Sequence, residues 1–198
     1  MGEPGRVGFT DDMGSTGRHG GKALSIGRKT MKPIYDFIDK AKQQQKPFFV
    51  WYAPFLPHTP HNPPERLLKK YAHVKDPRKA KYLAMIEWLD ETCGELMGQL
   101  KKKGVADNTL VIAASDHGPA PYAGQERVAT YLQIKELEKH GHYASGPFRG
   151  YKFSIYEGAF RVPFIVRWPG VVKAAGRCDQ TIGLIDLMAT LGEVTGAD

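Results

Sequence analysis

Cysteine is scarce in this sequence: the 198 residues include two, Cys93 and Cys178. Neither belongs to a CxxC pair, and two thiols are too few for a disulfide framework, so a small disulfide-stapled domain is excluded. Cys93 falls on the apolar stripe of an expected helix, which predicts a small residue of the core.

Long hydrophobic runs are also absent. No stretch approaches the roughly 18 apolar residues of a membrane span, and residues 1–20 have no apolar core of the kind that a signal peptide needs. The composition, 41% hydrophobic and 25% charged, is that of an ordinary globular protein. The length suits one domain with a real core, and neither an internal repeat nor a second domain is visible.

Acidic residues are outnumbered, 21 against 28 lysines and arginines, which gives a formal net charge of +7. One interpretation is a basic surface that binds nucleic acid or another polyanion. The other, which we favour, is a set of dispersed, solvated lysines. Lys101, Lys102 and Lys103 stand together at an expected helix end, where they complement the helix dipole. We therefore expect no nucleic-acid partner, although an anionic substrate would suit the charge.

Helical and strand patterns alternate along the chain. Helices are expected, largely from apolar residues at helical spacing, over residues 30–45, 79–103, 126–140 and 182–194. Short apolar runs predict strands at residues 48–53, 109–114 and 162–167. The first of these runs is continuous, which suits a strand buried on both faces. The alternation predicts an α/β fold of three layers, α/β/α, with a mostly parallel central sheet.

Two of the expected strands end in loops that hold candidate site residues, and ligand sites of open α/β sheets gather at the carboxyl ends of strands. Asp116 and His117 directly follow the strand at 109–114. A carboxylate at a dry strand end needs a cation or several donors. An adjacent Asp and His can ligate a metal through oxygen and nitrogen. The alternative is an aspartate that caps the next turn.

His58 follows the expected strand at 48–53 and is flanked by Pro57 and Pro60. The prolines stiffen the backbone, so the imidazole can be held at a fixed distance from a substrate. The alternative is a surface histidine in a turn, and this is the interpretation that we keep for His61.

Lys152 lies among glycine and aromatic residues, where its ammonium can be held against an anion. The alternative is an ordinary solvated lysine. Glu157 and Arg161, in the same segment, are four residues apart and can form a structural ion pair.

Four segments together resemble the sulfatase family, within the alkaline-phosphatase-like superfamily. They are PFFVWYAPFLPHTP (47–60), LKKKGVADNTLVIAASDHG (100–118), RGYKFSIYEGAFRVPFIVRWPG (149–170) and DQTIGLIDLMATLGEVTG (179–196). The resemblance implies hydrolysis of a sulfate monoester with a divalent metal, usually calcium, and a formylglycine nucleophile.

By this resemblance, Asp116 and His117 are metal ligands, and His58 and Lys152 are catalytic residues that contact the sulfate. The metal and Lys152 would neutralise charge on the sulfuryl oxygens as the S–O bond breaks. His58 would donate a proton or a hydrogen bond to the leaving oxygen. Ala159 stands where the family has the last glycine of Glu-Gly-Gly.

The formylglycine motif of the family, Cys/Ser-x-Pro/Ala-x-Arg, is matched by neither cysteine. Residues 145–149 fit its short pattern, but they lack the downstream Thr-Gly and follow the His58 segment, which the nucleophile precedes in the family. We therefore reject Ser145 as the nucleophile. Asp11 and Asp12 resemble the family's paired metal-binding aspartates, but too few residues precede them for a core strand, and we interpret them as a turn.

These departures predict an interior fragment. Residues 1–29 are expected to form a loop-rich edge segment, and residues 30–198 a partial sulfatase catalytic domain that is inactive by itself. Two other functions stay open, a phosphate- or phosphonate-ester hydrolase of the same superfamily and a non-catalytic polyanion-binding module. The expected substrate is a small-molecule or glycan sulfate ester, and the resemblance implies an exported protein, periplasmic or secreted.

Overall fold

The computed structural model describes residues 25–121 and 138–197. Its elements are α1 (Lys32–Gln43), α2 (Glu65–Lys70), α3 (Pro77–Lys102), η3 (Ala106–Asn108), β1 (Val111–Ala114), α5 (Glu157–Phe160), β2 (Phe164–Arg167) and α6 (Asp186–Thr195). Most of the expected helix at 126–140, and the pair Asp11 and Asp12, lie outside the described residues.

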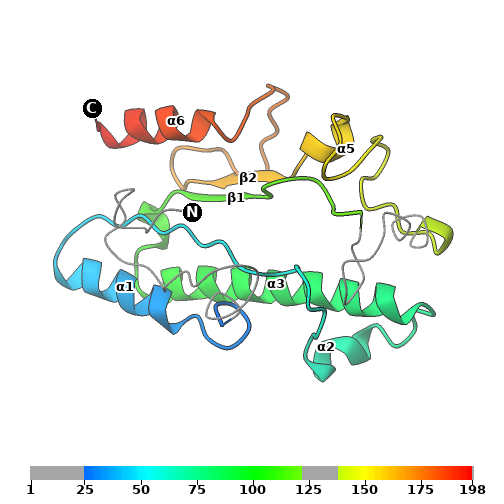
Figure 1. The fold of residues 1–198 in the computed structure, drawn as a ribbon. Helices are drawn as coiled ribbons and strands as arrows, with labels where there is room; N and C mark the ends of the chain where they lie inside the picture. Colours follow the sequence, from blue (N-terminus) through cyan, green and yellow to red (C-terminus); the bar gives the residue numbers. More distant parts are fainter. Residues whose placement is uncertain (1–24, 122–137, 198) are drawn as a thin grey trace.

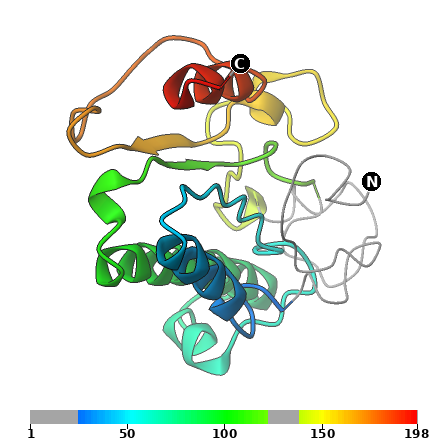
Figure 2. The same cartoon turned by 90° about the vertical axis from the view of Figure 1, so that its left-hand side faces the viewer.

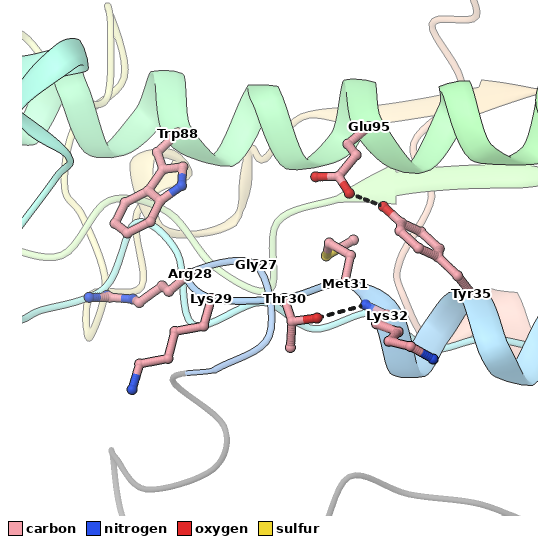
Figure 3. Close-up of a pocket in the computed structure, with 9 residues that line it drawn as sticks. All are labelled: Gly27, Arg28, Lys29, Thr30, Met31, Lys32, Tyr35, Trp88 and Glu95. Atoms are coloured by element: carbon pink, nitrogen blue, oxygen red, sulfur yellow. Dashed lines mark hydrogen bonds between the residues drawn. The ribbon is translucent and has the colours of Figure 1, made fainter.

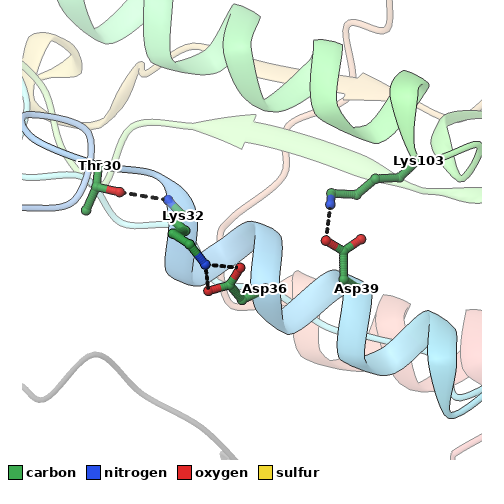
Figure 4. A network of polar contacts seen from close by, with 5 residues as sticks. All are labelled: Thr30, Lys32, Asp36, Asp39 and Lys103. Atoms are coloured by element: carbon green, nitrogen blue, oxygen red, sulfur yellow. Dashed lines mark hydrogen bonds and ion pairs between the residues drawn. The ribbon is translucent and has the colours of Figure 1, made fainter.

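Helix α1 begins two residues after its expected start, and just before it Thr30 Oγ1 accepts a hydrogen bond of 3.0 Å from the Lys32 amide. Its buried face consists of Ile34, Ile38 and Ala41. Polar contacts tie the outer part of the helix to α3: the Tyr35 hydroxyl donates to Glu95 at 2.7 Å (Figure 3). Lys103 Nζ lies 2.5 Å from Asp39 Oδ2 (Figure 4).

Helix α3 is the longest element, with 26 residues, and Asp76 caps its start by accepting a hydrogen bond from the Arg78 amide. Its buried residues are Ala80, Ala84, Met85, Thr92 and Leu100. Cys93 is exposed, so the prediction of a core cysteine is wrong. The buried side of the helix turns instead through Thr92, whose hydroxyl accepts a hydrogen bond from Tyr52 at 3.0 Å.

The expected strand at 48–53 is extended but forms no strand of the sheet. Phe48, Val50 and Tyr52 pack against the core cluster around Ile38 and Leu100. The alternate residues, Phe49 and Trp51, are 60% and 73% exposed. Residues 48–52 therefore bury one face rather than both. This agrees with the geometry of extended backbone, in which successive side chains point to opposite sides.

The sheet of the described residues has two strands, β1 and β2, paired antiparallel from Val111 opposite Arg167 to Ala114 opposite Phe164. The mostly parallel sheet that the sequence predicted is therefore not found in this part of the chain. The last residue of β1, Ala114, lies opposite the first residue of β2, Phe164, so the chain enters β2 at the end at which it left β1 and the two strands run in opposite directions.

Three layers are nevertheless visible (Figures 1 and 2): α6 lies on one side of the β1–β2 ribbon, and α1 and α3 lie on the other. The coarse prediction of an α/β fold is confirmed at this level. No residue of α6 is buried. None of the helices in the described ranges is both long and apolar enough to cross a membrane.

Candidate functional site

Two loops at the end of the β1–β2 ribbon are joined by backbone hydrogen bonds. The Gly118 amide donates to the Ala159 carbonyl at 2.8 Å, and the Lys152 amide donates to the Pro119 carbonyl at 3.0 Å. The loop with Asp116 and His117 and the loop with Lys152, more than 30 residues later in the chain, therefore form one hydrogen-bonded unit.

Glycine is required where the two loops meet. A Cβ on Gly118 would lie 1.9 Å from the Gly158 carbonyl oxygen, and a Cβ on Gly158 would lie 2.1 Å from the Gly150 carbonyl oxygen. Both distances are far inside van der Waals contact with backbone atoms that cannot turn aside. Ala159, the departure from Glu-Gly-Gly, is 4% exposed, so its methyl group is accommodated in the packed junction.

Asp116 and His117 face each other in the first of these loops, with Asp116 Oδ2 3.3 Å from His117 Nε2. His117 Nδ1 lies 2.7 Å from the Gly118 carbonyl oxygen, which assigns the N–H to Nδ1. The lone pair of Nε2 then points at a carboxylate. A carboxylate oxygen and a ring nitrogen at this distance can ligate one cation together.

The donor chemistry of this pair fits part of a divalent-metal site. A ligating histidine commonly donates its other ring N–H to a carbonyl, as His117 does to Gly118. The Asp116 side chain is 82% exposed and open to a ligand. Calcium takes about six to eight oxygen ligands, and no cluster of three or more His, Cys, Asp or Glu is found among the described residues. The pair would therefore be two members of a larger ligand set.

Lys152 is half-buried, and its Nζ lies 5.2 Å from the centre of the Phe153 ring. Phe153 has a φ of +77°, a left-handed conformation that is costly for a bulky residue. Such strain persists where the surrounding structure enforces it, as at ligand-binding loops. Within the described ranges, no carboxylate pairs with the Lys152 ammonium.

The other cations of this loop are engaged. Arg161 forms the expected ion pair with Glu157, at 2.6 Å, and lies over the ring of Phe148. Arg149 lies over the ring of Tyr156, 3.9 Å from its centre. Arg161 is therefore paired with a carboxylate, whereas Arg149 and Lys152 each lie over an aromatic ring.

His58 lies in a separate loop after the extended segment 48–53. Its Nδ1 is 2.9 Å from the Thr59 carbonyl oxygen, and its ring centre is 4.5 Å from that of Phe55. The structure thus brings Asp116, His117 and Lys152 into one unit, and the convergence of His58 with them stays a prediction.

His61 is buried, 4% exposed, and its ring lies 5.8 Å from that of Tyr82. The interpretation of His61 as a surface histidine is therefore wrong. Tyr82 also contacts His142, at 5.6 Å. Burial raises the pKa of Tyr82 and, aided by the charge of Lys79, lowers the pKa of His142. This cluster anchors the end of the His58 loop to α3.

Sequence reasoning missed Arg28, which makes four hydrogen bonds to the His58 loop. No motif surrounds it. The available signal was the proline content of residues 54–64, because a loop with few backbone N–H groups needs side-chain donors for its carbonyls.

Comparison with known proteins is consistent with this arrangement. The sulfatase family model matches residues 14–197. The chain belongs to the sulfatase family. Its resemblance to that family, read from four segments of the sequence, is confirmed by a match over nearly the whole chain.

Individual relatives have similar sequence identities to this chain. The chain is 33% identical to N-acetylgalactosamine-6-O-sulfatase of Bacteroides thetaiotaomicron, over 80% of this chain and 30% of that protein. It is 29% identical to rat (Rattus norvegicus) steryl-sulfatase, over 82% of this chain and 25% of that protein. A solved structure, Ps i-CgsB in complex with k-i-k-neocarrahexaose, superposes with a TM-score of 0.70 at 29% identity, over 84% of this chain and 33% of that one.

This sulfatase chain therefore spans between a quarter and a third of the length of these relatives. The fold of the described residues matches that of solved sulfatases. The roles of Asp116, His117, His58 and Lys152 stay predictions, and they are taken up as a proposal below.

Proposed function

We propose that the chain provides the metal- and sulfate-contacting loops of a sulfuric-ester hydrolase. The observation that supports this most directly is the junction in which the Lys152 amide donates to Pro119 and Gly118 to Ala159. The junction holds Asp116 and His117 in the same hydrogen-bonded unit as Lys152. Among the described residues, no carboxylate pairs with this lysine.

Each residue has a defined role in this proposal. Asp116 and His117 hold a divalent metal, which we propose to be calcium. The bound metal withdraws negative charge from the sulfuryl oxygens. Lys152 adds a second positive charge against those oxygens. His58, held by its loop, donates a hydrogen bond or a proton to the leaving oxygen.

Turnover needs a nucleophile as well. The sequence has no Cys or Ser in the formylglycine motif ahead of the His58 loop. We propose that the 198-residue chain binds metal and sulfate ester but does not hydrolyse the ester, because the covalent intermediate cannot form without the nucleophile. Release of 4-nitrophenol from 4-nitrophenyl sulfate by the purified chain would contradict this.

We propose a sulfated glycan as the substrate class. The support is the name of one relative, an N-acetylgalactosamine-6-O-sulfatase, and the neocarrahexaose bound to a structural neighbour. The excess of basic residues suits such an anionic substrate. We also propose that the protein is exported from the cytoplasm, because the family that it resembles has many exported, calcium-dependent members.

The test measures binding of Ca²⁺ and then of 4-nitrophenyl sulfate by calorimetry. Asp116→Asn should abolish calcium binding, whereas Asp90→Asn, at an exposed carboxylate of α3, should not. Lys152→Gln should weaken ester binding about tenfold or more, the worth of a charge-assisted contact. Lys173→Gln, at an exposed lysine, is the matched control.

Three outcomes would contradict the proposal. Ester binding that is strongly salt-sensitive, independent of calcium and unchanged by Asp116→Asn would indicate a polyanion-binding module. Tighter binding of 4-nitrophenyl phosphate than of the sulfate would indicate phosphate-ester chemistry. Equal effects of Lys152→Gln and Lys173→Gln would remove Lys152 from the site.

A further inference from the structure

Arg28 lies in a tight turn just before α1, in contact with both α3 and the His58 loop. The Lys29 and Thr30 amides both donate to the Ser25 carbonyl, at 2.8 and 3.1 Å, which closes the turn. Gly27 has a φ of +79°, and a Cβ there would lie 2.6 Å from the Tyr52 hydroxyl. The turn is therefore fixed against the body of the protein.

Both Nη atoms of Arg28 donate to a single loop. Its Nη2 donates to the carbonyls of Phe55 and His58, at 3.0 and 2.8 Å. Its Nη1 donates to the Pro60 carbonyl at 3.0 Å and to Asn62 Oδ1 at 2.6 Å. One side chain thus binds four positions across the eight residues from 55 to 62.

The backbone of this loop has few hydrogen-bond donors of its own. Pro57 and Pro60 have no N–H. Among the described residues, a backbone hydrogen bond within the loop runs from the Asn62 amide to the Pro60 carbonyl, at 3.1 Å. The carbonyls that a strand or helix would satisfy internally are satisfied here by the guanidinium. The planar fork of arginine can serve four acceptors at once, which a lysine ammonium with three donors cannot.

Arg28 itself is held by its surroundings. It is half-buried, and its guanidinium carbon lies 5.8 Å from the centre of the Trp88 ring of α3. Figure 3 shows the two side chains together at one end of a pocket of about 390 Å³, with Tyr35 and Glu95 at the other end. Burial lowers the pKa of Arg28, but an arginine stays protonated at any pH at which a protein is folded.

We propose that Arg28 is a positioning residue for His58: it fixes the backbone of residues 55–62 and thereby the place of the imidazole. The imidazole adds its own contacts, to Phe55 and Thr59, which are members of the same braced loop. The functional consequence rests on the proposed role of His58 in contacting sulfate. In this proposal Arg28 acts through the backbone of the loop and not by contact with the sulfate.

The first measurement needs no ligand. The imidazole Cε1–Hε1 signal of His58, assigned by its loss in His58→Asn, is recorded in the whole 198-residue chain. Arg28→Gln and Arg28→Lys should both shift and broaden it, because neither side chain can bind the four acceptors. Lys29→Gln, which removes the adjacent exposed charge from the same turn, should leave the signal in place.

The second measurement is binding of 4-nitrophenyl sulfate in the presence of Ca²⁺. Arg28→Gln and Arg28→Lys should each weaken binding about tenfold, as His58→Asn does. The double variant with His58→Asn should be no weaker than His58→Asn alone, since both changes remove the same contact. A residue that only stabilises the fold would give additive losses instead.

Several results would overturn the proposal. An unmoved His58 signal in Arg28→Gln removes the positioning role. Wild-type behaviour of Arg28→Lys, with loss in Arg28→Gln, assigns Arg28 a charge role instead. If neither variant folds, Asn62→Ala, which removes one acceptor, must still shift the His58 signal, or the proposal is wrong. If His58→Asn leaves ester binding unchanged while the signal shifts in both Arg28 variants, the role of His58 fails and the positioning by Arg28 stands.

Discussion

Asp76, at the start of α3, is 6% exposed, and its carboxylate lies close to the side chains of Arg78 and His140. Its Oδ1 accepts a hydrogen bond of 2.8 Å from the Arg78 amide, and its Oδ2 lies 3.1 Å from Arg78 Nη2 and 3.5 Å from His140 Nε2. The hydrogen bond from the Arg78 side chain is the main reason that the pKa of Asp76 lies below its usual value, and burial opposes it. This carboxylate links the start of α3 to the segment that contains His140.

Replacing Asp76 should therefore lower the free energy of unfolding. Asp76→Ala should cost about 1–2 kcal/mol at pH 7, since a capping side chain is lost. Because the pKa is depressed in the folded state, the advantage of wild type over Asp76→Asn should be present above the unfolded pKa of about 3.9. It should disappear as the pH falls through the lower folded pKa. Urea unfolding from pH 3 to pH 7 tests this, and Asp90→Asn should show no such pH-dependent difference.

Gly118, at the junction of the two site loops, allows a sharper prediction. Gly118→Ala puts a methyl group 1.9 Å from the Gly158 carbonyl oxygen, so the loops must separate. We expect a loss of about 1–3 kcal/mol in unfolding free energy, as for other overpacked sites. Calcium binding should fall at the same time, because Asp116 and His117 lie in the displaced loop. Calcium affinity equal to that of the wild type would show that the junction does not position the pair.

Among the elements, the helices were predictable because their signals are local. For α3, the expected helix at 79–103 agrees with the structure to within two residues at each end. Its buried face differs from the expected apolar stripe, because Ile86 and Cys93 are exposed. That face turns instead through Thr92, whose hydroxyl accepts a hydrogen bond from Tyr52. A polar residue with a long-range partner cannot be distinguished from a solvated one by periodicity.

The strands were harder to predict, because pairing depends on distant segments. Residues 48–53 alternate between packed and exposed side chains, although nearly all of them are apolar in sequence. The antiparallel pairing of β1 with β2 joins residues about 50 positions apart in the chain, and no local pattern specifies its direction. For the same reason, the sequence predicted Asp116, His117 and Lys152 as candidate site residues but did not predict the hydrogen bonds that join their loops.

Gly94 and Gly98 offer a prediction at the level of a helix. Both lie inside α3, and a Cβ at either would meet no atom within 4 Å. Since glycine is worse than alanine in a helix by about 0.8–1.0 kcal/mol, Gly94→Ala and Gly98→Ala should each stabilise the protein by roughly that amount. Calorimetry should show each Tm raised by about 2–4 °C. A lowered Tm would mean that α3 needs a close approach at that position.

For the whole molecule, the distribution of apolar surface is uneven. The core lies between α1, α3 and the extended segment 48–52. On the other side of the ribbon, α6 has no buried residue, and Ile185 and Met188 are 89% and 83% exposed. Ile155, in the Lys152 loop, is 86% exposed. Large apolar side chains exposed to this degree are available for contact with apolar ligands.

The exposed side chains of α6 should therefore make the protein bind a hydrophobic dye such as ANS in its folded state. The double variant Ile185→Glu/Met188→Glu removes two large apolar groups from the most open part of α6 and should reduce the fluorescence markedly at unchanged helix content. Thr190→Glu, on the same helix, adds charge without removing apolar surface and serves as the control. Circular dichroism separates this effect from unfolding, because a partly unfolded chain would bind more dye, not less. Equal dye binding by wild type and the double variant would place the accessible apolar surface elsewhere, and the Lys152 loop around Ile155 would then be the next segment to test.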